Sequence, residues 1–217
     1  MELNKILDTR YSAKAFDKTK KINSEDMETI KNLLQKAASS INLQPWHFFI
    51  ATSEESKELI AKSTAGNYSF NTEKIIDASA VVVFTTKIDI DDEHLNRLSD
   101  KEDLDGRYAT KQIKADSKAG VGMFVNYHKN IAKDAFVWSE KQTYLNLGSF
   151  LLGVASIGID AVPMEGFDKA TLDKALALKE KGLTSSVIVP IGFHTDADYN
   201  KLLPKSRLSK EDIIDMI

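Results

Sequence analysis

Four consecutive apolar residues, Val81-Val82-Val83-Phe84, constrain the fold more than any other part of this sequence. Side chains alternate between the two faces of a strand, so a run that is apolar at every position needs cover on both faces of its sheet. The run therefore predicts a buried strand over residues 79–86. Further strand-length runs at 46–52 and 185–191, and a short one at 160–164, are predicted as well.

Helical periodicity accounts for most of the remaining chain. Residues 24–38 carry apolar side chains three or four apart, behind a capping Asn23 or Ser24. Residues 134–157 are apolar on more than one face from Tyr144 onward and end before Gly158, so this helix is either central or packed against another subunit. Strands and helices do not alternate regularly, which favours an α+β fold in one domain over residues 1–217. The other predicted helices cover 3–9, 54–62, 73–77, 111–133 and 169–178.

Composition excludes several classes of chemistry. The 217 residues include no cysteine, so thiol nucleophiles, cysteine-held metal clusters and disulfides are absent. A net charge of −3 argues against a nucleic-acid-binding protein, and the acidic stretch at 89–105 is interpreted as a solvated helix face. The longest charge-free apolar run, at 147–159, is shorter than the ~18 to 20 residues of a membrane span. With no secretory signal in the first residues, we expect a cytoplasmic protein that binds neither nucleic acid nor membrane.

Common motifs of nucleotide, metal and hydrolase sites are missing. Gly120-Val121-Gly122 lacks the third glycine of a dinucleotide loop, and no Gly-Lys-Ser/Thr sequence occurs. Gly148-Ser149 is not followed by the rest of a nucleophile elbow. The histidines are not paired at ligand spacing, so no metal site is predicted; they are His47, His94, His128 and His194.

A set of cations in loop-like surroundings remains unexplained. They lie at opposite ends of the chain and comprise Arg10, Lys14, Lys74, Lys205 and Arg207. They are either ordinary surface charges or a site for a phosphate and a second electron-rich group, for which arginine forks and lysine point charges are the usual ligands. Composition leaves both interpretations open.

At these residues the chain resembles the FMN-dependent, oxygen-insensitive NAD(P)H nitroreductases. The resemblance spans essentially the whole chain and rests on separated blocks that occur in the family's order. These blocks are Arg10-Tyr11-Ser12-Ala13-Lys14-Ala15-Phe16, Ser39-Ser40-Ile41-Asn42-Leu43-Gln44-Pro45-Trp46-His47, Gly66-Asn67-Tyr68 with Asn71 and Lys74, Ala161-Val162-Pro163-Met164-Glu165-Gly166-Phe167, and Leu203-Pro204-Lys205-Ser206-Arg207. It implies a central, mostly antiparallel sheet flanked by helices in an intertwined homodimer.

The resemblance also implies how the flavin is held. Arg10, Lys205 and Arg207 would bind the FMN phosphate, with Tyr11 and Ser12 beside them. Lys14, Asn71 and Lys74 would lie at the pyrimidine end, where positive charge favours two-electron reduction. The backbone from Pro163 through Met164 and Glu165 to Gly166 would approach the ring, and the partner subunit would contribute Ser39, Ser40 and Asn42. The long apolar helix would then form the dimer core.

The implied binding surface for nicotinamide and acceptor lies over the flavin. It comprises Lys14, Ile41, Ala65, Asn67, Tyr68, Phe70, Asn71, Phe124 and Tyr199. The sequence departs from the closest pattern at Tyr11, Ala38, Ile41 and Tyr199. None of these positions supplies a catalytic group, so the departures concern substrate preference.

The function implied is transfer of two electrons from NAD(P)H through FMN to nitroaromatics, quinones or pteridines in a ping-pong reaction. No catalytic side chain is required beyond the cofactor, and Lys14, Lys74 and Glu165 would tune or position it. A dedicated flavin, quinone or dihydropteridine reductase with incidental nitroreductase activity is the alternative within this class. A non-enzymatic flavin-binding electron carrier and a cofactor-free interaction domain are the alternatives outside it.

Overall fold

A four-stranded antiparallel sheet forms the centre of the chain in the computed structural model, which describes residues 2–217. Its spatial order is β1-β2-β4-β3. In the register, Val83 of β2 lies opposite Phe49 of β1 on one side and Ile188 of β4 on the other. The α+β, mostly antiparallel prediction is confirmed. The strands are β1 (Trp46–Ala51), β2 (Ala80–Lys87), β3 (Asp160–Ala161) and β4 (Leu183–Gly192).

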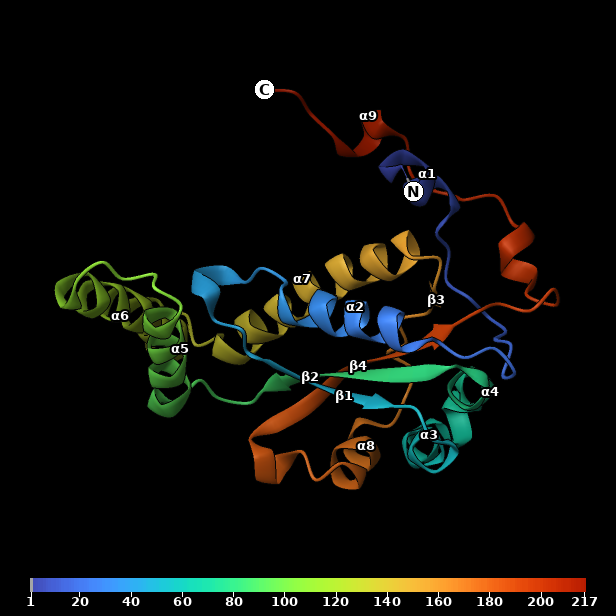
Figure 1. Ribbon diagram of the computed structural model, residues 1–217, viewed down its shortest axis with the longest axis horizontal. Helices are drawn as coiled ribbons and strands as arrows, with labels where there is room; N and C mark the ends of the chain where they lie inside the picture. The colour runs from blue at the N-terminus through green and yellow to red at the C-terminus, as the bar shows by residue number, and fades with distance from the viewer. Residues whose placement is uncertain (1) are drawn as a thin grey trace.

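Strand β2 is covered on both faces, as its apolar run requires. Val81 and Val83 pack in one core cluster with residues of α3 (Glu54–Ala61), α4 (Thr72–Asp77) and α8 (Lys169–Ala175). Val82 and Phe84 point the other way, into a second cluster with α2 (Ser24–Gln35) and α7 (Ala135–Ser156). Figure 1 shows these two helical layers above and below the sheet. Each of the four side chains is 0% exposed.

The observed helices and strands follow the predicted ranges closely, with three differences. Asn23 caps α2 by accepting from Asp26 N, and Gly158 adopts φ +78° after α7. The predicted 160–164 strand is reduced to β3, because Pro163 has no N–H for the ladder; Met164 rejoins β4 through one bridge to Ile188. Helix α2 stops at Gln35, and the predicted 111–133 helix changes at residue 127 from α to π geometry. The remaining elements are α1 (Leu3–Thr9), η1 (Ser40–Asn42), η2 (Lys62–Thr64), η3 (Gly66–Asn71), α5 (Asp92–Leu104), α6 (Lys111–Asn126), η4 (Tyr127–Ile131), η5 (Lys179–Lys181), η6 (Tyr199–Leu202) and α9 (Lys210–Ile213).

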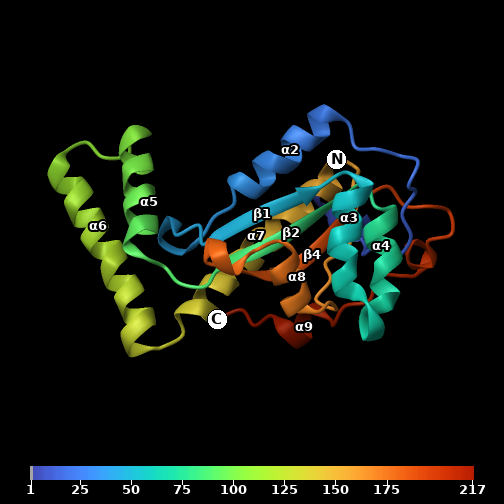
Figure 2. The same ribbon diagram turned by 90° about the horizontal axis from the view of Figure 1, so that it is seen from below.

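Helices α5 and α6 form a pair at one end of the molecule, away from α3 and α4 at the other (Figure 2). Helix α7 buries Leu147 and Phe150 against the sheet but leaves Val137 and Leu145 about half exposed in the single chain. This distribution agrees with the expectation that one sheet face does not cover the whole helix. Within residues 2–217, no helix is long and apolar enough to cross a membrane.

Candidate functional site

Three cations from the two ends of the chain meet beside α1. Lys205 Nζ donates to Arg10 O at 2.6 Å and also to Leu7 O, at the C-terminal end of α1. Burial lowers the pKa of Lys205 below its usual range, and the nearby charges of Arg10 and Arg207 lower it further. The structure therefore brings Arg10, Lys205 and Arg207 together, and their mutual repulsion leaves the group suited to an anion.

A second pair of cations lies at the start of α4. Burial, followed by the positive charge of Lys14, lowers the pKa of Lys74. Lys74 Nζ donates to Asn71 Oδ1 at 3.0 Å and to Phe70 O. Neither Lys14 nor Lys74 forms an ion pair with a carboxylate anywhere in residues 2–217. Neither lysine therefore has an ion-pair partner, and the carboxylate of Glu73 offsets only part of the lowering of the Lys74 pKa.

Asn71 links α4 to the segment around Gly166. Asn71 directly precedes α4, but its side chain does not cap the helix. Its amide Nδ2 instead donates to Gly166 O at 2.9 Å, and Asn71 is 5% exposed. A Cβ at Gly166 would lie 2.9 Å from that Nδ2 and 3.3 Å from the ring of Tyr68. Only glycine leaves room for this close approach.

The neighbouring carboxylate is oriented by α7. Tyr144 Oη donates to Glu165 Oε1 at 2.6 Å, and the pKa of Tyr144 is raised first by burial and then by this carboxylate. Met164 is anchored to β4 by mutual backbone bonds with Ile188, and Pro163 precedes it. Residues 163–166 therefore form a fixed backbone rim beside Asn71.

Asp198 and Asn200, which the sequence did not single out, hold the loop that carries Ser12 and Lys14. Asp198 is 1% exposed, and its Oδ2 accepts from Lys14 N at 2.7 Å and from Ala15 N at 3.2 Å. Asn200 Nδ2 donates to Ser12 O at 2.8 Å. Their partners are main-chain atoms, which every residue has, so no local sequence pattern could have identified these roles.

Tyr11 turns its hydroxyl inward. Its ring packs against the core and edge-on to His194, and the buried hydroxyl makes no hydrogen bond. Burial raises the pKa of Tyr11, and the carboxylates of Asp160 and Asp198 raise it further. The phenol is thus directed toward these acids, and its contribution to the site is packing of the loop.

Five predicted site residues lie at the opposite end of the sheet. Ser40, Ile41 and Asn42 form η1, Ser39 precedes it, and Phe124 lies in α6. The α5 and α6 pair stands at the opposite end of the molecule from α4 (Figure 1). Ser40 N donates to Gln142 Oε1 at 2.8 Å and Asn42 Nδ2 to Glu102 Oε1 at 2.7 Å. A single chain does not bring these residues to the cations at residues 14 and 74.

The η1 backbone is strained. Ile41 has a φ of 48°, which a β-branched residue adopts only when its surroundings enforce it, whereas asparagine tolerates the φ of 55° found at Asn42. Such strain is concentrated at functional sites, and here it presents the 39–42 segment outward at one end of the molecule.

Aromatic side chains stand unusually exposed around the second pair of cations. Phe70 is 66% and Tyr199 62% exposed, Tyr68 36%, and Phe124 at the far end 52%. Ala65 and Asn67 are also exposed. Lys74 Nζ lies 5.4 Å from the centre of the Phe70 ring. Exposed flat rings next to unpaired cations form a surface suited to stacking a flat, electron-rich ligand.

No cluster of three or more His, Asp or Glu side chains that could hold a metal ion occurs within the described residues 2–217. The groups that this surface offers to a ligand are cations, backbone donors and aromatic rings.

The Nitroreductase family model matches residues 7–193. The oxygen-insensitive NAD(P)H nitroreductase of Salmonella typhimurium is 52% identical over 97% of each chain, and that of Enterobacter cloacae is 50% identical over 99% of each. A protein of Exiguobacterium sibiricum solved in complex with FMN shares the fold, with a TM-score of 0.81 at 24% identity over 100% of this chain and 98% of that one. Since the family model covers most of the chain and two relatives are about half identical over nearly all of it, the chain belongs to the nitroreductase family.

Proposed function

We propose that this protein is an FMN-dependent NAD(P)H oxidoreductase that reduces nitroaromatics, quinones or pteridines by two-electron, ping-pong transfer. The observation that carries the proposal is the arrangement of cations without a carboxylate partner. One group is formed by Arg10, Lys205 and Arg207, and the other by Lys14 and Lys74. The names of the relatives at 50% identity and above support the same activity.

The donor set fits the two ends of FMN. A dianionic phosphate would neutralise Arg10, Lys205 and Arg207, whose positive charges repel one another. Ser12 lies on the same loop as Arg10 and could assist them. A flavin ring needs a positive charge at its pyrimidine end and a flat backbone rim. Lys14, Lys74 and Asn71 would supply the first, and Pro163, Met164, Glu165 and Gly166 the second, because Asn71 packs directly on the Gly166 backbone and joins the two groups.

When bound, FMN supplies the redox chemistry, accepting a hydride from NAD(P)H and passing two electrons to the acceptor. The residues of the chain bind and orient. The ammonium groups of Lys14 and Lys74 stabilise the negative charge that develops at the pyrimidine end, which favours two-electron over one-electron reduction. Asn71 holds the Gly166 backbone in place, and Tyr144 orients Glu165. No side chain needs to act as a nucleophile.

The aromatic surface would bind the nicotinamide and the acceptor in turn. Phe70 offers an exposed ring beside Lys74, Tyr68 lies near Gly166, and the exposed Tyr199 follows Asp198, which holds the Lys14 backbone. Ala65 and Asn67 are exposed in the segment that precedes Phe70. Small aromatic acceptors of several classes can stack there, because stacking requires a flat face rather than a particular set of hydrogen bonds.

The complete site would be assembled by a homodimer in the cytoplasm. Helix α6, which carries Phe124, and the 39–42 segment lie at the opposite end of the molecule from α4 (Figure 1), so a second copy would bring Ser39, Ser40, Ile41, Asn42 and Phe124 over the flavin. The half-exposed Val137 and Leu145 of α7 support an interface along that helix. The absence of cysteine agrees with a reducing compartment.

Steady-state kinetics test this proposal. NAD(P)H oxidation measured at several fixed acceptor concentrations should give parallel double-reciprocal lines and should depend on FMN. Intersecting lines, or oxidation that is independent of FMN, would contradict the ping-pong flavin reaction. Sedimentation of the same sample should show twice the mass of one chain, whereas an active monomer would refute the shared site.

A further inference from the structure

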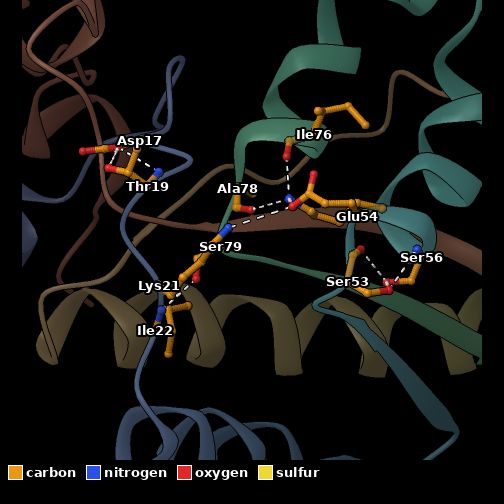
Figure 3. Close-up of polar contacts among 11 residues, drawn as sticks. Asp17, Thr19, Lys21, Ile22, Ser53, Glu54, Ser56, Ile76, Ala78 and Ser79 are labelled. Atoms are coloured by element: carbon orange, nitrogen blue, oxygen red, sulfur yellow. Dashed lines mark hydrogen bonds and ion pairs between the residues drawn. The ribbon is translucent and has the colours of Figure 1, made fainter.

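Lys57 is the largest side chain that is completely buried, and the proposed function leaves it without a role. It lies in α3 at 0% exposure. Its Nζ donates to Ile76 O at 2.5 Å and to Ala78 O at 3.1 Å, and it pairs with Glu54 Oε1 at 2.9 Å. Figure 3 shows these acceptors converging from α3 and from the end of α4.

This arrangement is not an ordinary helix-surface ion pair. Lysine is almost never fully buried unless it is paired, because its charge must leave water. Glu54, three residues earlier, is 66% exposed at its side chain and forms only one of the contacts of the ammonium. The other contacts are two main-chain carbonyls, that of Ile76 in the last turn of α4 and that of Ala78 directly after the helix. Lys57 therefore acts on the end of α4.

Helix α4 has no other cap. It is six residues long, Asn71 makes no side-chain cap, and no backbone bond is formed from its C-cap Ala78. The last carbonyls of a helix need partners and favour a cation. The Lys57 ammonium gives these carbonyls a hydrogen-bond partner and a positive charge. In the turn that follows, Ser79 Oγ accepts a hydrogen bond from Ile22 N at 2.7 Å.

The opposite end of α4 is held at the candidate site. Thr72 Oγ1 shares a 2.8 Å hydrogen bond with Thr64 Oγ1, and Asn71 donates to Gly166 O. At 1.5 Å per residue the helix is about 9 Å long, so Lys74 is only about 3 Å along the axis from the carbonyl that Lys57 holds. A shift at Ile76 is therefore transmitted to Lys74 with little loss.

We propose that Lys57 is a positioning residue for the redox site: by holding the carbonyls of Ile76 and Ala78, it sets where the ammonium of Lys74 stands relative to the flavin. The inference rests on the proposed function, since it assigns Lys57 an effect on FMN. Without Lys57 the end of α4 loosens, the Lys74 charge is spread over several positions, and reduced FMN loses part of its stabilisation.

A substitution series separates this role from simple stabilisation of the fold. Lys57→Met keeps most of the length of the side chain and removes the charge and the donors. Ile30→Val, in the core cluster on the other face of the sheet, is the matched control because it weakens a fully buried site without contact to α4. Lys57→Gln retains one donor group and carries the test if the methionine variant does not fold.

Two measurements are made on each full-length variant. Hydrogen exchange without flavin should show faster exchange of the α4 amides in Lys57→Met, but not in Ile30→Val. With FMN bound, the preference for reduced over oxidised flavin should fall about tenfold in Lys57→Met, which is about 30 mV to lower midpoint potential in a two-electron couple. Lys57→Gln should shift the potential in the same direction by less. The ratio of FMN to riboflavin affinity should stay at its wild-type value, because the phosphate cations are not on α4.

An unchanged midpoint potential in the lysine variants would overturn the inference, even if they melt at a lower temperature. An equal shift in Ile30→Val would also overturn it, because the effect would then belong to stability in general. A wild-type protein that binds no FMN would instead refute the proposed function, and the exchange data would still report whether Lys57 holds α4.

Discussion

Gly166→Ala is the substitution for which the structure makes the sharpest prediction. The added Cβ would lie 2.9 Å from Asn71 Nδ2, 3.3 Å from Tyr68 Cδ1 and 3.4 Å from Phe70 Cζ. The first distance is shorter than real Cβ contacts, so Asn71 has to move. Because Asn71 is 5% exposed and also bonded to Lys74, it cannot move without breaking its bond to Gly166 O.

The expected cost follows from two terms. Loss of the hydrogen bond destabilises by about 1 kcal/mol. Forcing the Asn71 side chain away from its rotamer adds about 1 kcal/mol. For a chain of this size each kcal/mol lowers the melting temperature by roughly 2 to 4 °C, so Gly166→Ala should melt roughly 4 to 8 °C below the wild type. If the flavin lies against this backbone, displacement of the rim should also weaken FMN binding about tenfold, equivalent to about 1.4 kcal/mol.

Thermal unfolding without flavin and an FMN titration followed by flavin fluorescence measure the two effects separately. Gly120→Ala is the control, because nothing lies within 4 Å of a Cβ there and alanine favours a helix. It should melt at or above the wild-type temperature and bind FMN normally. A Gly166→Ala protein with wild-type melting would refute the steric argument. One that melts lower but binds FMN normally would refute the placement of this backbone beside the flavin.

Three further substitutions test other parts of the account. Lys205→Ala should weaken FMN binding about tenfold to a hundredfold, because a charge-assisted bond to the phosphate is lost. Riboflavin lacks the phosphate and should bind as it does to the wild type. Equal losses for both ligands in a fluorescence titration would contradict this role. The pKa of Lys74 is lower in the folded chain than its usual value of 10.5. At pH values between the two, the unfolded chain binds more protons than the folded chain, so the free energy of unfolding rises with pH. Urea unfolding of flavin-free Lys74→Met should lack this gain, and an identical pH slope in both proteins would argue against it. At Gly153→Ala the added Cβ would overlap Leu33 Cδ2 and lie 2.7 Å from Leu33 Cδ1. The substitution should therefore lower the free energy of unfolding in denaturant by about 1 to 3 kcal/mol through the contact between α2 and α7. The flavin potential should stay unchanged.

Much of the fold could be predicted because hydrophobic pattern and burial agree along the chain. Val81 to Phe84 had to be covered on both faces, and the two core clusters cover them. Asn23 and Gly158 mark helix ends by chemistry that acts locally. The short strand at 160–164 was overestimated because its side chains fit a strand, although Pro163 cannot donate to the ladder.

The site was only partly predictable, because its supports act through main-chain atoms distant in sequence. Arg10, Lys14, Lys74, Lys205 and Arg207 were identified as unexplained cations and through family resemblance. From the local sequence, Lys57 would be interpreted as one half of an exposed i, i+3 charge pair with Glu54. Its carbonyl partners in the folded chain lie 19 and 21 residues further along the sequence. Asp198 is likewise one of two acids, with Asp196, in a stretch of sequence that carries no recognisable motif. A carbonyl or an N–H carries no sequence signature, so such roles become visible only in the folded chain.

The most direct test of the central claim is the absorbance spectrum of the FMN-loaded protein during anaerobic addition of NADH or NADPH, followed by a nitroaromatic. Our account predicts that the flavin bands bleach with the pyridine nucleotide, return with the acceptor, and pass through no long-lived radical. A bound flavin that does not bleach would contradict the reductase and favour an electron carrier. A colourless protein that takes up no added FMN would contradict the flavin site itself.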